Sequence, residues 1–486
     1  MNEIVFLLLI LVFQIFDFLY KSSILQNQYY DLKRFFLYTL QNKKIFLIKL
    51  ILIILTFFVL KINIYFIFVA LLSFVHKNKN MKVTFTKRII RMCIIFIFLF
   101  LLNVFLIIFL EKNSGYYSYL LLTYNLTIYY FSFFLSLIIE KIIQKKYIKL
   151  AQKKLLKYQT IIVGITGSYG KTSCKNYAYK LLEKKYKVLC SPKSYNTLMG
   201  VTKTINNYLR PYHQILLLEI GVDKKNGMNK FLKYYSFDVG VITCIGNQHL
   251  KTFKSIKNII NEKKKIGEKA KNCAIFRKDD FLKTTLHHQN KTCFSSTLNA
   301  DICVQKTKDN KITLIINNNY YESSSNLVGE HNLSNLACAI SIAKYFNVSD
   351  HDIIKIIPSI KNIEHRLSVT KKGNWTIIDD AYNSNFDGFK NALKTLAKYN
   401  DLKVLITPGV IESNKEKTKY EIEISNLINE TVDLALLIKK PSIKKYISNY
   451  LEFETFSDAF NYLKKEYKDK RLTILIENDL PNIYLR

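Results

Sequence analysis

A glycine-rich segment in the middle of the chain has the composition of a phosphate-binding loop. A buried-strand pattern at 161–165 precedes the sequence TGSYGKT at 166–172, and a helical pattern follows it. Glycines let successive backbone N–H groups turn toward one anion, and the helix directs its positive end there. Lys171 would reach the β- and γ-phosphates of a nucleotide, and Thr172 would hold Mg²⁺. The predicted phosphate-binding residues are Gly167, Ser168, Gly170, Lys171 and Thr172.

The glycine spacing departs from the usual P-loop pattern. Ile165 occupies the position of the first glycine, and Gly164 lies one residue too early. The shortened loop resembles the ATP loop of the Mur ligase family, and the resemblance continues to about residue 415, about half of the chain. It is greatest to the branch that joins D-alanyl-D-alanine to UDP-N-acetylmuramoyl (UDP-MurNAc) tripeptide. The resemblance therefore implies an ATP-dependent, ADP-forming amide ligase of peptidoglycan synthesis that uses ATP and Mg²⁺.

Glu219 closes a predicted strand after five apolar residues, so its charge needs a partner, and a cation is a natural one. The resemblance implies that Glu219 helps to hold Mg²⁺. It also implies that His249, which follows the next predicted strand, is a ligand of a second metal ion. By itself, a histidine at this place is more often a helix-start or core residue.

The resemblance aligns Lys263 with a lysine that is carbamylated in the family. Carbamylation converts an ammonium group into an anionic group that can ligate Mg²⁺. Lys264 and Lys265 adjoin it, so an ordinary basic helix face is the alternative. The predicted metal ligands are thus Thr172, Glu219, His249 and Lys263, and the predicted catalytic residues are Lys171, His249 and Lys263.

Asn332 and Asn335 open an alanine-rich helical segment that resembles the adenine-side segment of the family. Asn side chains can read an adenine edge through paired donor and acceptor groups. The alternative is an ordinary helix cap formed by Asn332 or Ser334. Both readings are compatible with one another.

A third group of residues lies further along the chain. The resemblance implies that Arg366 faces the nucleotide phosphates from the far domain, that Asp380 contacts the ribose, and that Asn383 contacts the nucleotide or the substrate. Phe386 replaces the proline that ends the family's motif, which changes the loop after Asn385 more than the contacts before it.

The implied reaction activates a carboxylic acid. Its carboxylate attacks the γ-phosphate of ATP to give an acyl phosphate, and an amine then displaces phosphate to form the amide. Catalysis would come from alignment and from cationic charge around the transferring group. Because Arg366 lies on the far domain, closure about a hinge near 358–364 would assemble the site.

The predicted substrates are UDP-MurNAc-tripeptide and D-Ala-D-Ala, and no nucleic acid partner is expected. Two alternatives stay open. One is a ligase acting on a lipid-linked or polymeric carboxylate, similar to poly-γ-glutamate synthases. The other is an inactive ATP-binding membrane scaffold that recruits wall-synthesis proteins, against which the nearly complete set of motif residues argues.

The N-terminal region lacks the sugar-gripping domain of the family and is rich in apolar runs, at 4–16, 45–75, 93–110 and 119–139. About 20 apolar residues span a bilayer, so these runs predict four or five transmembrane helices, and lysine-rich loops place the catalytic part in the cytoplasm. We therefore expect a multi-pass protein of the inner membrane that contacts membrane lipid. The net charge of +35 fits a nucleic acid, an anionic lipid or a phosphate-rich substrate, or simply an A/T-rich codon bias.

Together these patterns predict an α/β fold, with a P-loop central domain and a C-terminal Rossmann-like domain after a helical transmembrane region. The predicted boundaries are 1–145, 146–360 and 361–486. The C-terminal strands are expected near 376, 403, 434 and 472. Eight cysteines without metal-ligand spacing make a zinc site or a disulfide framework improbable.

Overall fold

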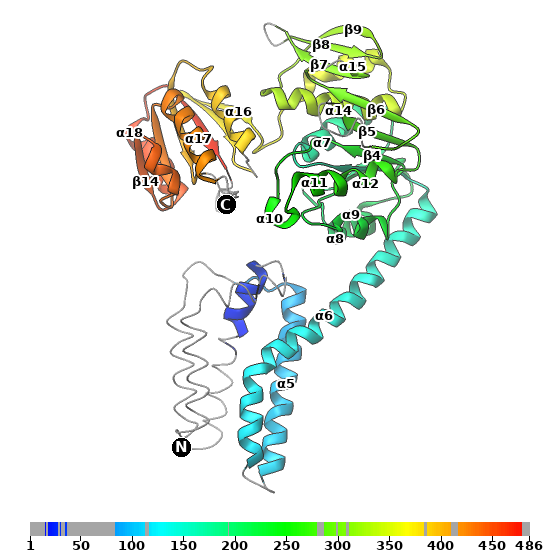
Figure 1. Ribbon diagram of the computed structural model, residues 1–486, viewed down its shortest axis with the longest axis vertical. Coiled ribbons are helices and arrows are strands. Elements are labelled where there is room, and N and C mark those ends of the chain that lie inside the picture. Colours follow the sequence, from blue (N-terminus) through cyan, green and yellow to red (C-terminus); the bar gives the residue numbers. More distant parts are fainter. Residues whose placement is uncertain are drawn as a thin grey trace. The chain divides into compact units, whose positions relative to one another are not determined.

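The computed structural model of the chain describes residues 15, 18–27, 30, 35, 83–111, 116–192, 194–278, 286–297, 300–307, 311–382, 386–409 and 417–478. Two compact units make up the chain, Met1–Lys146 and Tyr147–Arg486. Helix α6 (Tyr116–Tyr158) runs from the first unit into the second (Figure 1).

The first unit has a core formed by α5 (Lys87–Glu111), α6 and an N-terminal helical segment. Phe96 and Leu99 from α5 pack with Tyr129 and Phe133 from α6, and Arg91 Nε donates a hydrogen bond of 2.8 Å to Glu140 Oε1. Long apolar runs are therefore used here, at least in part, to bury helices against one another.

The expected membrane spans are not found among the residues that the structure describes. Within the described ranges, the structure contains no helix that combines the length and the apolar character needed to cross a bilayer. The runs at 93–110 and 119–139 lie in α5 and α6, whereas those at 4–16 and 45–75 lie almost entirely outside the described residues. The prediction of a multi-pass inner-membrane protein is wrong for these helices: α5 and α6 pack on each other through residues such as Phe96 and Phe133, and neither qualifies as a span.

The second unit begins with a nine-stranded sheet in the order β2-β3-β1-β4-β5-β6-β7-β8-β9. Neighbouring strands from β2 to β7 run parallel, and β8 and β9 complete the sheet as antiparallel strands. The strands are β1 (Ile161–Thr166), β2 (Val188–Cys190), β3 (Ile215–Glu219), β4 (Val239–Ile242), β5 (Cys273–Arg277), β6 (Lys291–Ser295), β7 (Ile302–Lys306), β8 (Lys311–Ile316) and β9 (Asn319–Ser324).

Helices cover both faces of this sheet, because successive side chains of a strand point to opposite faces. Val163 and Ile165 of β1 pack in the core under α7 (Lys171–Leu182) and α14 (Glu330–Tyr345). Ile162 faces the other core. That core is covered by the end of α6, α8 (Leu198–Tyr208), α9 (Gly227–Leu232), α10 (Leu250–Phe253), α11 (Ile256–Lys263) and α12 (Lys265–Glu268). Helix α15 (Asp350–Ile356) packs in the first core, with α7 and α14.

A second sheet of six strands follows, in the order β10-β11-β15-β12-β13-β14. Only the β10–β11 pair is antiparallel. Its strands are β10 (Ser368–Lys372), β11 (Trp375–Asp380), β12 (Leu402–Thr407), β13 (Leu434–Ile438), β14 (Tyr450–Phe453) and β15 (Leu472–Glu477). One face packs on α16 (Phe386–Leu396) and α17 (Lys417–Thr431), and the other on α18 (Phe456–Glu466).

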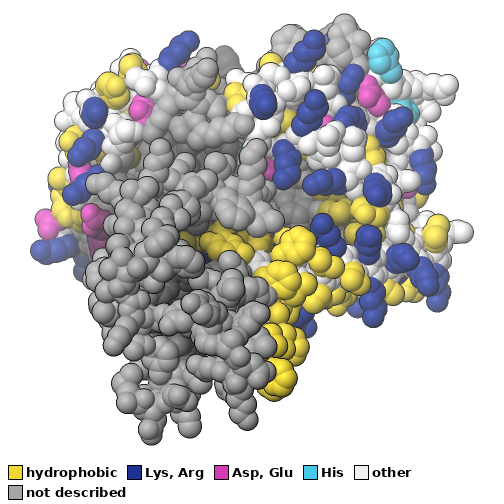
Figure 2. Space-filling model, turned by 60° about the horizontal axis from the view of Figure 1, so that its bottom comes forward, with side chains coloured by type: hydrophobic (Ala, Val, Ile, Leu, Met, Phe, Trp, Pro, Cys, Tyr) yellow, Lys and Arg dark blue, Asp and Glu magenta, His cyan; other side chains and the backbone are white. Residues whose placement is uncertain are grey.

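These two helix-covered, mostly parallel sheets confirm the predicted α/β fold of a P-loop-type domain and a Rossmann-like domain. The C-terminal strands predicted near 376, 403, 434 and 472 correspond to β11, β12, β13 and β15. The exact boundaries at 145 and 360 stay predictions. Lys and Arg side chains are spread over the face shown in Figure 2, with few Asp and Glu side chains between them, in keeping with the net charge of +35.

Candidate functional site

The predicted phosphate loop lies where β1 ends and α7 begins. Gly170 precedes α7 with a φ of 80°, in the left-handed region that favours glycine. A Cβ on Gly170 would lie 2.1 Å from Asn335 Oδ1, and a Cβ on Gly167 would lie 2.0 Å from Thr243 Oγ1. Neither position has room for a side chain, so the two glycines allow the close packing of the loop.

Ser168 ties the loop to the segment after β4. Its backbone N–H donates to Cys244 O at 2.6 Å, and its hydroxyl donates to Gly246 O and accepts from Gly246 N–H, both at 3.0 Å. Ser168 is buried. Its hydroxyl is therefore part of the loop's internal support, in addition to the phosphate contact predicted for the residue.

Two lysines meet at one carbonyl oxygen of the loop. Lys171 Nζ donates to Gly167 O at 2.7 Å and to Ser168 O at 2.9 Å, and Lys263 Nζ donates to Gly167 O at 2.8 Å. Burial lowers the pKa of Lys171 to about 8, and it lowers the pKa of Lys263 well below its usual value, with the charge of Lys171 acting in the same direction. The loop thus holds two amino groups close together, and burial disfavours the charged form of both.

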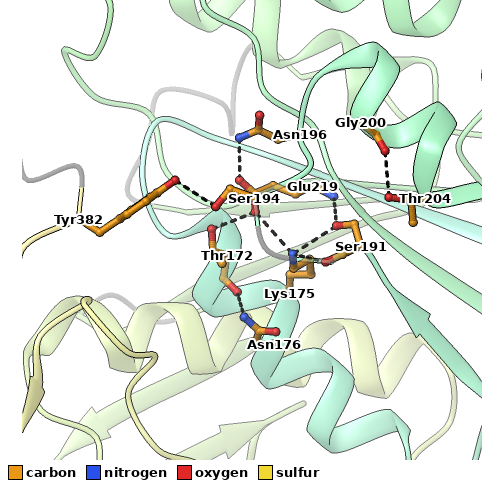
Figure 3. Close-up of polar contacts among 10 residues, drawn as sticks. All are labelled: Thr172, Lys175, Asn176, Ser191, Ser194, Asn196, Gly200, Thr204, Glu219 and Tyr382. Atoms are coloured by element: carbon orange, nitrogen blue, oxygen red, sulfur yellow. Dashed lines mark hydrogen bonds and ion pairs between the residues drawn. The ribbon is translucent and has the colours of Figure 1, made fainter. Parts of the chain in front are cut away.

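Glu219 is the second centre of the site. Its side chain is 2% exposed, and Thr172 Oγ1 donates to its Oε2 at 2.9 Å while Asn196 Nδ2 donates to its Oε1 at 3.0 Å. Figure 3 shows these side chains converging on the carboxylate. The parallel pairing of β1 with β3 places residue 165 beside Glu219, so the end of β3 lies next to the phosphate loop.

Lys175 is a member of this cluster that the sequence analysis did not identify. Its Nζ lies 3.7 Å from Glu219 Oε2 and donates to Ser191 O at 2.7 Å, and the residue is 1% exposed (Figure 3). The sequence contains a signal for this position. Residues three apart lie on one face of a helix, and Lys175 is three residues after Thr172, so both side chains are expected on the same side of α7. A buried lysine needs a partner, which Glu219 supplies.

The Thr172–Glu219 pair fits one Mg²⁺ ion. Mg²⁺ in nucleotide sites is held by one or two protein oxygens, together with water and phosphate oxygens, and here a buried carboxylate and a hydroxyl lie 2.9 Å apart beside the loop. His249 is exposed and precedes α10 with a φ of 58°. The described part of the chain contains no group of three or more His, Cys, Asp or Glu side chains suited to a metal. A second-metal role of His249 and Lys263 stays a prediction.

Asn332 and Asn335 lie in the first turns of α14, and both are buried. Asn332 Nδ2 donates to Val328 O at 2.8 Å, and its Oδ1 accepts from Asn335 Nδ2 at 3.2 Å and from the hydroxyl of Tyr177 at 3.3 Å. Asn332 therefore links α14 to α7. Since Asn335 packs against Gly170, both residues adjoin the phosphate loop, and adenine recognition by them stays a prediction.

Arg366 lies just before β10, and Asp380 is the last residue of β11. The Arg366 guanidinium carbon lies 4.8 Å from the centre of the Tyr382 ring, and Asp380 Oδ1 accepts the Leu367 N–H at 3.0 Å. Burial raises the pKa of Asp380 to about 7. The charge of Arg366 contributes to the lowered pKa of Lys171, so the guanidinium is within electrostatic range of the loop. Asn383 lies outside the described residues.

Comparison with known proteins agrees with this geometry. Residues 165–343 match the family model of the Mur ligase middle domain. This part of the chain is therefore similar to the Mur ligase middle domain. It contains the phosphate loop, Glu219, His249, Lys263 and the start of α14.

Similarity extends beyond that domain. A UDP-N-acetylmuramoyl-tripeptide–D-alanyl-D-alanine ligase of Buchnera aphidicola subsp. Baizongia pistaciae is 28% identical over 334 residues, which cover 65% of this chain and 72% of that ligase. The ligase of the same name from Bacillus subtilis is 28% identical over 255 residues, which cover 51% of this chain and 55% of that ligase. This chain thus spans between about half and three quarters of these two ligases.

The fold is shared with a solved structure of a Mur ligase. The MurF ligase from Thermotoga maritima, in complex with ADP, aligns with a TM-score of 0.62 and 21% identity, and the alignment covers 69% of this chain and 80% of that chain. The likeness covers more of the chain than the middle domain alone, so the chain shares the fold of that ligase over about two thirds of its length.

Proposed function

We propose that this chain is an ATP-dependent amide ligase that joins D-Ala-D-Ala to UDP-MurNAc-tripeptide during peptidoglycan precursor synthesis. The observation that carries the proposal is the phosphate loop with Lys171, next to a buried Thr172–Glu219 pair at 2.9 Å. The relatives named above supply the choice of substrates. ATP and Mg²⁺ are the cofactors.

In the proposed reaction, the terminal carboxylate of the tripeptide attacks the γ-phosphate of ATP and gives an acyl phosphate and ADP. The amine of the dipeptide then attacks the acyl carbon, an amide forms, and phosphate leaves. Bound Mg²⁺ would offset the charge of the transferring phosphoryl group. The protein's part is alignment and electrostatic stabilisation, since no covalent bond to the enzyme is needed.

Each loop residue has a specific part in this proposal. Lys171 donates to loop carbonyls at 2.7 and 2.9 Å, and turning its ammonium to the phosphates exchanges these hydrogen bonds for charge-assisted ones. Thr172 and Glu219 would hold Mg²⁺. Arg366 would contact the phosphates, Asp380 the ribose, and Asn332 and Asn335 the adenine side.

Lys263 is proposed to act as a carbamate. Its pKa lies well below the usual lysine value because the residue is buried, and this favours the neutral form of the amine. A neutral amine adds to carbon dioxide, forming an N–C bond and releasing a proton. The product is an anionic group next to the phosphate loop. His249 is proposed as its partner at a second Mg²⁺ ion.

The predicted contact with membrane lipid loses its basis with the correction of the membrane spans, and a wall-synthesis protein partner stays a prediction. The first unit takes the place of the family's sugar-gripping domain in the sequence. The assay with UDP-MurNAc-tripeptide therefore tests whether the chain binds the UDP-sugar without that domain.

The test is phosphate release by purified protein with ATP, Mg²⁺, UDP-MurNAc-tripeptide and D-Ala-D-Ala. We expect release that depends on both substrates and is abolished in Lys171→Ala with the fold intact by circular dichroism. Normal turnover of Lys171→Ala would refute the loop assignment. Release only with a polymeric carboxylate would refute the proposed substrates and favour the synthase-like alternative, and no release with any acceptor would favour the inactive scaffold.

A further inference from the structure

Arg366 lies in a turn with an unusual backbone. The residues on either side of it, His365 and Leu367, have φ values of 60° and 54°. Left-handed conformations cost residues other than glycine on the order of 1 kcal/mol or more, and they persist where the surroundings hold them. Something in the structure therefore fixes the turn that carries Arg366.

Asn362 holds the turn from one side. Its Nδ2 donates to Leu367 O at 2.6 Å and to Val328 O at 3.0 Å, and its Oδ1 accepts the Val328 N–H at 3.0 Å. Val328 precedes Gly329 and α14, the helix with Asn332 and Asn335. One amide side chain thus joins the residue after Arg366 to the segment that leads into the nucleotide-side helix.

His365 holds the turn from the other side. Its Nδ1 donates to Asp379 Oδ2 at 2.7 Å, and its carbonyl oxygen accepts the Tyr382 N–H at 3.2 Å. Asp379 lies in β11 of the second sheet. The same edge of that sheet supplies the Tyr382 ring below the guanidinium of Arg366.

Leu367 completes the arrangement. It is fully buried, its N–H donates to Asp380 Oδ1 at 3.0 Å, and its C=O accepts from Asn362. Both of its backbone polar groups are therefore held by side chains. The turn is tied to the segment before α14 and to the end of β11.

We propose that Asn362 and His365 are positioning residues that fix the turn of Arg366, so that its guanidinium is directed at the phosphates of the nucleotide. Neither residue touches the nucleotide in this proposal, and both act through Arg366. The inference deepens the proposed function and rests on it for the role of Arg366. It adds to that function the two side chains on which the orientation of this arginine depends.

A double-mutant cycle tests the proposal. The affinity for a non-hydrolysable ATP analogue with Mg²⁺ is measured by calorimetry for the wild type, Asn362→Ala, Arg366→Met and the double variant. We expect Asn362→Ala to weaken the affinity about tenfold when Arg366 is present and to have little further effect in the Arg366→Met background. The effects of two substitutions do not add when one residue acts through the other. Equal losses in both backgrounds, or no loss at all, would overturn the proposal.

A matched control and a second variant complete the experiment. Asn326 is an exposed asparagine in the adjoining segment, and its Nδ2 donates a hydrogen bond of 3.1 Å to Pro358 O. Asn326→Ala should bind the analogue as the wild type does. His365→Asn removes the imidazole but keeps a residue that tolerates the left-handed conformation. It should weaken binding only when Arg366 is present, and it carries the test if Asn362→Ala fails to fold.

The calorimetry is done without acceptor, so it is separate from the test of the ligase reaction. If the wild type releases no phosphate with UDP-MurNAc-tripeptide and D-Ala-D-Ala but the cycle shows coupling, the proposed substrates fail and the positioning role stands. If phosphate is released and the cycle shows no coupling, the positioning role fails and the ligase function stands.

Discussion

The Nζ of Lys263 lies 2.8 Å from the carbonyl oxygen of Gly167, so α11 reaches the phosphate loop through a single buried side chain. Lys171 donates to the same oxygen. Two ammonium groups this close repel each other, and burial disfavours the charged form of both. Burial and the charge of Lys171 both lower the pKa of Lys263, which favours the neutral amine that carbamylation requires.

Removing the Lys263 amine should therefore abolish the carbamate and the ligase reaction that depends on it. We expect Lys263→Ala to lose at least about 10- to 100-fold in kcat, since losing a group around a metal commonly costs that much. Short carboxylic acids such as acetate should restore part of the activity by supplying the missing anion. Lys257→Ala, on the exposed face of the same helix, is the control and should keep full activity. Unchanged kcat in Lys263→Ala would contradict the role.

The lowered pKa of Lys171 predicts a specific pH dependence. Its pKa is lowered to about 8 by burial, so the free enzyme loses the positive charge of the loop as the pH rises through 8. We expect kcat/KM for ATP to fall about tenfold per pH unit well above that value. A guanidinium stays charged throughout this range, so Lys171→Arg should show less activity without that alkaline fall. A wild-type profile that is flat up to pH 9.5 would contradict the assignment.

Much of the fold could be predicted from the sequence because parallel strands buried on both faces appear as continuous apolar runs. β1, β3 and β4 are of this kind, and the glycines of the phosphate loop mark its position directly. The placement of Glu219 beside that loop also follows, since the carboxyl ends of parallel strands share one edge of a sheet.

The contacts that complete the site could not be predicted in this way. Asn196 meets Glu219, and Asn362 meets Leu367, only because loops between elements bring them together. The membrane prediction failed for a related reason. The two apolar runs in α5 and α6 pack on each other through one side of each helix, and the composition of a run does not show which of its residues make such contacts.

The buried pair of Lys175 and Glu219 predicts a large effect on stability. Lys175→Met leaves a buried carboxylate without its cation, which should lower the free energy of unfolding by about 3 kcal/mol. Added Mg²⁺ would supply the missing positive charge, so it should raise the Tm of Lys175→Met more than that of the wild type. Lys180→Met is a matched control on the same helix, because Lys180 is 55% exposed and pairs with Glu183 at 2.8 Å.

An exposed pair of that kind contributes at most about 1 kcal/mol, so Lys180→Met should unfold nearly as the wild type does and respond to Mg²⁺ in the same way. Equal Mg²⁺ responses of Lys175→Met and the wild type would show that the cation does not bind at Glu219.

Asp380 predicts how the stability of the nucleotide-free protein depends on pH. Burial raises its pKa from 3.8 to about 7, so the folded state binds its proton more tightly than the unfolded state does. The free energy of unfolding should therefore decrease as the pH rises from about 4 to about 7, because ionisation is easier in the unfolded chain. Asp380→Asn keeps an oxygen for the Leu367 N–H and removes the titration.

The free energy of unfolding of Asp380→Asn, relative to that of the wild type, should increase by about 2 kcal/mol between pH 4 and pH 7. This value allows for partial exposure of the carboxyl group. Above pH 8 the difference should be constant. Urea unfolding at a series of pH values measures the difference. Asp433→Asn is the control. Asp433 also accepts a backbone hydrogen bond, from the Lys403 N–H at 2.7 Å, but its side chain is exposed. A constant difference between Asp380→Asn and the wild type from pH 4 to pH 8 would mean that Asp380 ionises as easily in the folded protein as in the unfolded chain.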